Sequence, residues 1–71
     1  MTLAELEYGE VRVIQELAGP EEVVLSLQEL GFVPGSEVEL VARSLFMSPL
    51  AYRIKGTVFA LRKNEAECIQ V

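Results

Sequence analysis

The sequence predicts a small, mostly β domain: a partly open barrel of five short strands, with one α-helix between the first strand and the second. Three observations support this prediction. Segments of alternating apolar and polar residues recur along the chain, with turn signals between them. One segment instead has the apolar spacing of an amphipathic helix. The segment Leu30–Gly35 combines the signals for a helix end, a turn and a strand start.

Length and composition limit the class of protein. The 71 residues form a single predicted domain, 1–71, because so short a chain builds one hydrophobic core. Eleven acidic side chains, all Glu, outnumber six basic ones and give a net charge of -5, which disfavours nucleic acid and anionic lipid as partners. The single cysteine fits a reducing, cytoplasmic setting. We expect no signal peptide, and no apolar run approaches the roughly 20 residues of a membrane helix.

The first predicted elements are a helical turn and a strand. Thr2–Glu5 has the spacing of a capping box, which favours one short helical turn. From Glu10 to Leu17 the residues alternate with period two, so we predict a strand with Val11 and Val13 facing the core.

The predicted helix begins near Ala18–Gly19–Pro20. Gly19 is an acceptable N-cap, Pro20 suits the first helical position, and the two glutamates that follow suit the positive end of the helix dipole.

One face of that helix is apolar. Val23, Leu27 and Leu30 have i, i+4, i+7 spacing and are predicted to face the core, with Val24 beside them. Leu25 falls near the polar side, so the core does not obviously need it.

The segment after the helix is predicted to turn sharply. Gly31 suits the positive φ of a helix C-cap, and Phe32 is predicted to be buried. Pro34 and Gly35 have the chemistry of a type II turn.

Four more strands complete the predicted barrel: 37–43, 50–54, 57–61 and 68–71. In the first of these, Val38, Leu40 and Ala42 share one face, which we predict to be the inner one.

The later strands have apolar positions at the same spacing. The residues predicted to face inward are Leu50, Tyr52, Ile54, Phe59, Leu61, Ile69 and Val71. Lys55-Gly56 is compatible with a tight hairpin turn, and 64–66 with a single capped turn.

The residue types argue against catalysis and against a metal or cofactor site. There is no His, which removes the usual general base and the commonest neutral metal ligand, and no nucleophile–base spacing is visible. Cys68 alone offers sulfur, and we expect it to be a half-buried hydrophobe. The pairs Glu37/Glu39 and Glu65/Glu67 are more simply solvated carboxylates.

The strongest candidate for a contact surface is an apolar loop. Leu45, Phe46, Met47 and Leu50 either cap the barrel or meet a partner, and we favour the second interpretation because Met and Phe are enriched at interfaces. Leu25 would extend this surface.

Two arginines are predicted to lie near each other across paired strands. These are Arg43 and Arg53, for which simple surface charge is the commoner role. We nevertheless include Arg53, together with the apolar loop and Leu25, among the residues predicted to contact a partner.

Two motifs resemble those of the ferrous-iron transport protein A (FeoA) family. The first spans Leu27–Val38 and has the pattern Leu-x-Glu-Leu-Gly-Phe-x-Pro-Gly-x-x-Val. The second spans Gly56–Val71 and contains Gly56, Ala60, Leu61, Arg62, Glu65, Ala66, Ile69 and Val71. We interpret the motif positions as structural, namely Gly31, Phe32, Pro34, Gly35, Gly56, Leu61 and Arg62.

The resemblance implies an SH3-like barrel in the bacterial cytoplasm. It also implies a non-enzymatic accessory protein that binds a membrane ferrous-iron permease carrying a GTP-binding domain. On this basis Arg62 invites a further hypothesis, an arginine supplied in trans to the GTPase site. A structural Arg62, paired with Glu65 or Glu67, is the simpler interpretation.

An alternative stays open. The same barrel occurs as the C-terminal domain of metal-dependent repressors of the diphtheria-toxin-repressor type. The chain could therefore be a stand-alone module of that kind, which binds another protein or self-associates as a homo-oligomer.

Overall fold

The computed structural model describes residues 1–44 and 49–71 of the chain. In these ranges the strands form a four-stranded antiparallel sheet, in the order β1-β3-β4-β5, and a two-stranded sheet of β2 and β6. The elements are η1 (Leu3–Glu5, a 3-10 helix), β1 (Val11–Val13), β2 (Glu16–Leu17), α1 (Glu21–Leu30), β3 (Glu37–Arg43), β4 (Leu50–Ile54), β5 (Thr57–Leu61), α2 (Lys63–Ala66) and β6 (Ile69–Gln70).

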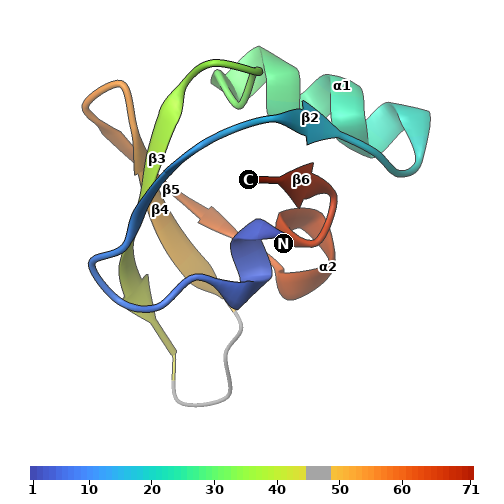
Figure 1. The fold of residues 1–71 in the computed structure, drawn as a ribbon. Coiled ribbons are helices and arrows are strands. Elements are labelled where there is room, and N and C mark those ends of the chain that lie inside the picture. The colour runs from blue at the N-terminus through green and yellow to red at the C-terminus, as the bar shows by residue number, and fades with distance from the viewer. Residues whose placement is uncertain (45–48) are drawn as a thin grey trace.

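Figure 1 shows the curved four-stranded sheet on one side of the molecule, with η1, α2 and β6 opposite it and α1 across one end. The two termini lie close together, and the Val71 N–H donates to the Met1 carbonyl at 2.9 Å. The mostly β, partly open architecture is therefore confirmed, although the expected first strand is divided into β1 and β2.

The predicted inward face of that first strand is wrong. Val11 and Val13 are 50% and 42% exposed, and Ile14 is the residue that enters the core. The reason is the pairing with β3, where Val11 lies opposite Glu39 and so shares its outward face. At Ile14 the chain leaves the sheet, and its backbone bonds the turn after α1, with its N–H donating to the Ser36 carbonyl.

Helix α1 begins one residue later than predicted. Pro20 is its N-cap with an extended ψ of 134°, and the Pro20 carbonyl accepts the first helical bonds. Leu27 is buried and Val23 packs against the core. Leu30 was expected inside but is 42% exposed, whereas Phe32, two residues later, is fully buried.

The turn after α1 has the predicted geometry. Gly31 caps the helix with φ 110°, and the Phe32 N–H donates back to the Leu27 carbonyl at 3.0 Å. Gly35 has φ 91°, and the Ser36 N–H reaches the Val33 carbonyl at 3.2 Å, as a type II turn requires.

Strand β3 places two of its three predicted inward residues in the core. Val38 and Leu40 are each 1% exposed, but Ala42 is exposed. A register shift against β4 between Leu40 and Ala42 breaks the alternation, as a β-bulge does.

The β4–β5 hairpin agrees with the sequence pattern. Its two-residue turn, Lys55-Gly56, has φ of 49° and 80°, the pair of positive values that a type I′ turn needs. Leu50, Tyr52 and Ile54 are buried in alternation, and the ring of Phe59 packs on the core with Leu61 buried beyond it.

Tyr52 connects the sheet to the N-terminal segment. Its side chain is fully buried, and its hydroxyl donates to the Leu3 carbonyl at 2.8 Å. Burial raises the pKa of Tyr52 to about 12, although the positive charge of Arg43 opposes the shift.

The raised pKa of the buried Tyr52 predicts a loss of stability at high pH. The pKa of Tyr52 is higher in the folded protein than the ordinary value of 10. The contribution of this group to the unfolding free energy is therefore complete below pH 10 and is lost as the pH rises toward 12. The loss should reach about 2–3 kcal/mol of unfolding free energy. Urea unfolding of wild type and Tyr52→Phe between pH 8 and 12 measures it.

The variant should cost about 1 kcal/mol at neutral pH, because it leaves the Leu3 carbonyl without its donor, and its stability should fall less at high pH. Tyr8→Phe is the matched control, since Tyr8 is 73% exposed. Equal alkaline losses in wild type and Tyr52→Phe would contradict the assignment.

Strands β2 and β6 form the second sheet, and we call their short pairing the seam. Glu16 and Leu17 pair with Gln70 and Ile69, and the Ala18 N–H donates to the Cys68 carbonyl at 2.8 Å. Gly19 lies so close that an added Cβ would meet the Cys68 sulfur at 2.6 Å. Cys68 is 8% exposed, more buried than expected, and its Sγ lies 3.4 Å from the Asn64 carbonyl oxygen.

Candidate functional site

The structure separates the residues that the sequence grouped into one contact surface. Leu50 is 1% exposed and belongs to the core, so its side chain is not available to a partner. The reason is that Leu50 already starts β4, where it faces Leu61 across the hairpin. Leu45, Phe46 and Met47 lie outside the described residues.

Leu25 and Arg53 lie on different parts of the surface. Leu25 is 50% exposed on α1 and lines a hollow with Glu21 and Glu22. Arg53 lies on β4, where its Nη1 donates to Glu39 Oε1 at 2.9 Å. The two residues therefore do not form one site with each other.

The expected proximity of Arg43 and Arg53 is also wrong. In the β3–β4 register Arg53 lies opposite Glu39, whereas Arg43 lies opposite Leu50. Antiparallel pairing brings residues together only when they are directly or diagonally opposite, and these two arginines are separated by four positions along β3 and three along β4.

An exposed apolar surface is instead present on the outer side of the four-stranded sheet, and the sequence analysis did not find it. One row across the strands runs from Val11 to Glu39, Arg53 and Val58, since each is directly opposite the next. Val13 lies on the same side, two residues beyond Val11. We call Val11, Val13 and Val58, with the ion pair Glu39–Arg53 between them, the outer face.

The outer face contains a shallow hollow of about 280 Å³. It is lined by Val11, Glu37, Val38, Glu39, Arg53, Lys55 and Gly56. Val11 and Val58 are about half exposed. Exposed β-branched side chains therefore surround a charged pair on this face of the sheet.

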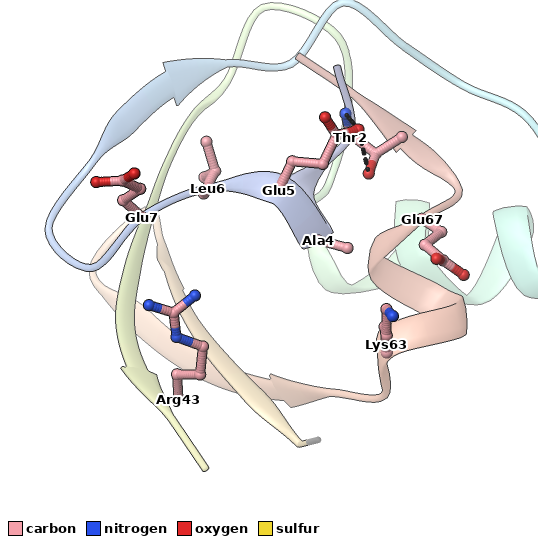
Figure 2. Close-up of a pocket in the computed structure, with 8 residues that line it drawn as sticks. All are labelled: Thr2, Ala4, Glu5, Leu6, Glu7, Arg43, Lys63 and Glu67. Atoms are coloured by element: carbon pink, nitrogen blue, oxygen red, sulfur yellow. Dashed lines mark hydrogen bonds between the residues drawn. The ribbon is translucent and has the colours of Figure 1, made fainter. Parts of the chain in front are cut away.

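A larger hollow of about 620 Å³ lies at the end of the sheet where β3 stops. Figure 2 shows Arg43 of β3 and Glu7 on one side of it, and Lys63 of α2 and Glu67 on the other. Ala4 and Leu6 of the N-terminal segment lie between the two sides. Glu5 turns away, because its Oε1 accepts the Thr2 backbone N–H at 3.1 Å.

Within the described ranges, neither Arg43 nor Lys63 makes an ion pair. Their charges are therefore available at this hollow, at the end of β3. An anionic or hydrogen-bond-accepting partner group would find two donors there.

Arg62 follows the last residue of β5 and is the N-cap of α2. Its backbone N–H donates to Glu65 Oε1 at 2.8 Å, so Glu65 contacts the main chain of Arg62. In the part of the chain that the structure describes, the Arg62 side chain makes no ion pair with Glu65 or Glu67 and is exposed.

The described residues show no arrangement typical of a metal site or a membrane span. No group of three or more His, Cys, Asp or Glu side chains there is arranged to hold a metal ion. No helix in those ranges is both long and apolar enough to cross a membrane.

Comparison with known proteins assigns the family. The FeoA domain model matches residues 1–71, the full length of the sequence. The chain belongs to the FeoA family.

Solved FeoA structures share the fold of this FeoA domain. The FeoA of Stenotrophomonas maltophilia, determined in complex with zinc, is 36% identical with a TM-score of 0.90, over 100% of this chain and 88% of that one. Iron(II) transport protein A of Clostridium thermocellum is 34% identical with a TM-score of 0.93, over 99% of this chain and 43% of that one. No curated protein sequence matches significantly.

The relation to metalloregulators is one of fold. A manganese-dependent transcriptional repressor superposes with a TM-score of 0.88 at 16% identity, over 97% of this FeoA domain and 39% of the repressor. The expected SH3-like FeoA fold, and its occurrence in repressors of this type, are both confirmed.

Proposed function

We propose that this FeoA domain is a non-enzymatic, cytoplasmic accessory protein of ferrous-iron uptake, which docks on the cytosolic part of a GTP-binding ferrous-iron permease. The observation that carries the proposal is the family match over residues 1–71. The absence of His from the whole sequence agrees with a role in binding rather than in acid–base catalysis.

The contact is proposed at the end of the sheet that holds the larger hollow. Residues 45–47, Leu-Phe-Met, follow one residue after the end of β3, and Arg43 and Lys63 line the hollow at that end of the sheet. Apolar side chains would supply the buried centre of such an interface, and the two cations would orient the partner from its rim. Leu50 has no part in this contact because it is buried.

Capture by the permease's cytosolic domain tests the proposal. Immobilised domain should retain the wild-type protein, and Phe46→Ser should weaken the affinity about tenfold or more, as truncation of a central apolar contact does. Leu25→Ser is the matched control: it also removes an exposed apolar side chain, but on α1, and it should bind like the wild type. No capture of the wild type would refute the docking, and equal capture of Phe46→Ser would refute the surface.

The same reagents test the hypothesis of an arginine supplied in trans. If Arg62 acts on the GTPase site, saturating protein should accelerate GTP hydrolysis and Arg62→Ala should remove the acceleration. Unchanged GTP turnover under saturating binding would restrict the protein to assembly of the permease.

A further inference from the structure

We infer that the free edge of β5 binds an extended, acidic-flanked segment of a partner protein by adding it to the four-stranded sheet. The strand edge is distinct from residues 45–47 of the proposed permease contact, although Lys63 lies next to both. The inference does not depend on which protein supplies the segment.

Strand β5 is an unpaired edge in the described structure. It is the last strand in the order β1-β3-β4-β5 and pairs with β4 on one side only. The hairpin closes at Ile54 and Thr57, so hydrogen-bonded and non-hydrogen-bonded pairs alternate from there. Val58 and Ala60 therefore direct their N–H and C=O groups away from β4.

Those backbone groups have no partner within the described residues. Neither Val58 nor Ala60 takes part in a backbone or side-chain hydrogen bond outside the strand pairing, and both residues are exposed. Buried backbone groups without a partner are rare, so these groups face solvent. Two donors and two acceptors are thus available at strand spacing.

The two edges of the sheet differ in how they are protected. Strand β1 at the other edge has three residues with Arg12 at its centre, and Arg12 pairs with Glu10 at 2.8 Å. Strand β5 has five residues, Thr-Val-Phe-Ala-Leu, with no charge, no proline and no shift in its register with β4. Short strands and charges block pairing at an edge, and β5 has neither.

The charges around β5 indicate which kind of segment can bind at its edge. Residues 53–63 contain four of the six basic side chains of the sequence, Arg53, Lys55, Arg62 and Lys63, and no carboxylate, in a chain of net charge -5. Of these four, only Arg53 makes an ion pair in the described ranges. Lys55 lies at one end of the strand, and Arg62 and Lys63 lie at the other.

A second copy of the chain is a poor occupant of this edge. Antiparallel pairing of two β5 strands, with Val58 opposite Ala60, would bring the Lys55 turn of one copy toward the Arg62–Lys63 end of the other at both ends of the pair. Like charges brought together in this way disfavour the association. An uncharged, extended segment of about five residues with Glu or Asp at both ends meets the same edge with opposite charges.

The test uses a synthetic nine-residue peptide with the sequence Glu-Glu-Thr-Val-Thr-Val-Thr-Glu-Glu and the full protein labelled with ¹⁵N. In the free protein the amides of Val58 and Ala60 should exchange with solvent much faster than that of Phe59, which bonds β4. Added peptide should shift the Val58 and Ala60 resonances and slow their exchange about tenfold or more.

Two control peptides separate the backbone contribution from the charge contribution. The same peptide with its central amides N-methylated should not bind, and a peptide with Lys in place of Glu should bind at least about tenfold more weakly. The double variant Lys55→Asn, Lys63→Gln should weaken binding of the acidic peptide about tenfold, since each exposed charge pair contributes a factor of a few. Arg43→Gln, which removes a charge away from the edge, is the matched control.

Other results would overturn the inference. Equal binding of acidic and basic peptides would exclude selection by charge, and shifts confined to other strands would exclude the edge. No binding at millimolar peptide would mean that the basic residues at the two ends of β5 protect its edge from pairing and do not attract a partner. Concentration-dependent dimerisation through Val58 and Ala60 would make a second copy the occupant. None of these results bears on Phe46 and the permease contact.

Discussion

Phe32→Ala is expected to leave most of the protein unfolded at room temperature. The Phe32 side chain is fully buried, and its ring meets that of Phe59 edge-to-face, with centroids 5.9 Å apart and planes at 61°. Truncation of a buried Phe to Ala costs about 3–5 kcal/mol. A domain of this size has a total stability of about the same magnitude.

Far-UV circular dichroism and urea titration measure the effect of Phe32→Ala. Leu25→Ala is the matched control, because Leu25 is half exposed, and its unfolding free energy should change by about 0.5 kcal/mol or less. A cooperative Phe32→Ala transition within about 1 kcal/mol of the wild type would show that the core tolerates the cavity.

Gly31→Val should destabilise the fold by about 2 kcal/mol or more, through the backbone alone. Gly31 has φ 110°, which a β-branched residue hardly adopts, yet nothing lies within 4 Å of an added Cβ. The cost is therefore conformational strain at the helix end and not a clash with a neighbour.

Gly31→Asn separates these two causes. Asn tolerates positive φ better than Val, so its loss should be clearly smaller although its side chain occupies the same open space. Equal losses for the two variants in urea titration would argue against strain. Partner binding by Gly31→Val should fall only in proportion to the fraction unfolded, because Gly31 acts as a helix cap.

Local signals in the sequence were enough to predict the turns. Gly31, the Pro34-Gly35 pair and Lys55-Gly56 each define a backbone conformation that depends on their own chemistry, and the structure has all three. The strand 50–54 and its buried face could be predicted equally well, because one of its faces is almost wholly apolar.

The face of β1 could not be predicted from its own residues. Val11 and Val13 alternate with polar neighbours, which shows that they share a side but not that the side is buried. The side was decided by register with β3, since Val11 lies opposite Glu39 and not opposite Val38. The outer face was missed for the same reason, as Val11, Arg53 and Val58 come together only through three strand pairings.

The remaining differences have local causes. Leu50 was predicted both to face inward in strand 50–54 and to extend the contact surface of the preceding loop, and the structure shows only the first role, because Leu50 begins β4 and is buried. Ala42 follows a bulge that period-two counting cannot include.

Because Gly19 lies close to the Cys68 thiol, the reactivity of that thiol reports on local opening of the structure. The single thiol of the sequence sits at the seam of β2 and β6, with its sulfur 2.6 Å from where a Gly19 Cβ would be. A thiol reagent can reach it freely only when that seam separates. The rate at which Cys68 of the wild-type chain is modified therefore measures how often β2 and β6 separate.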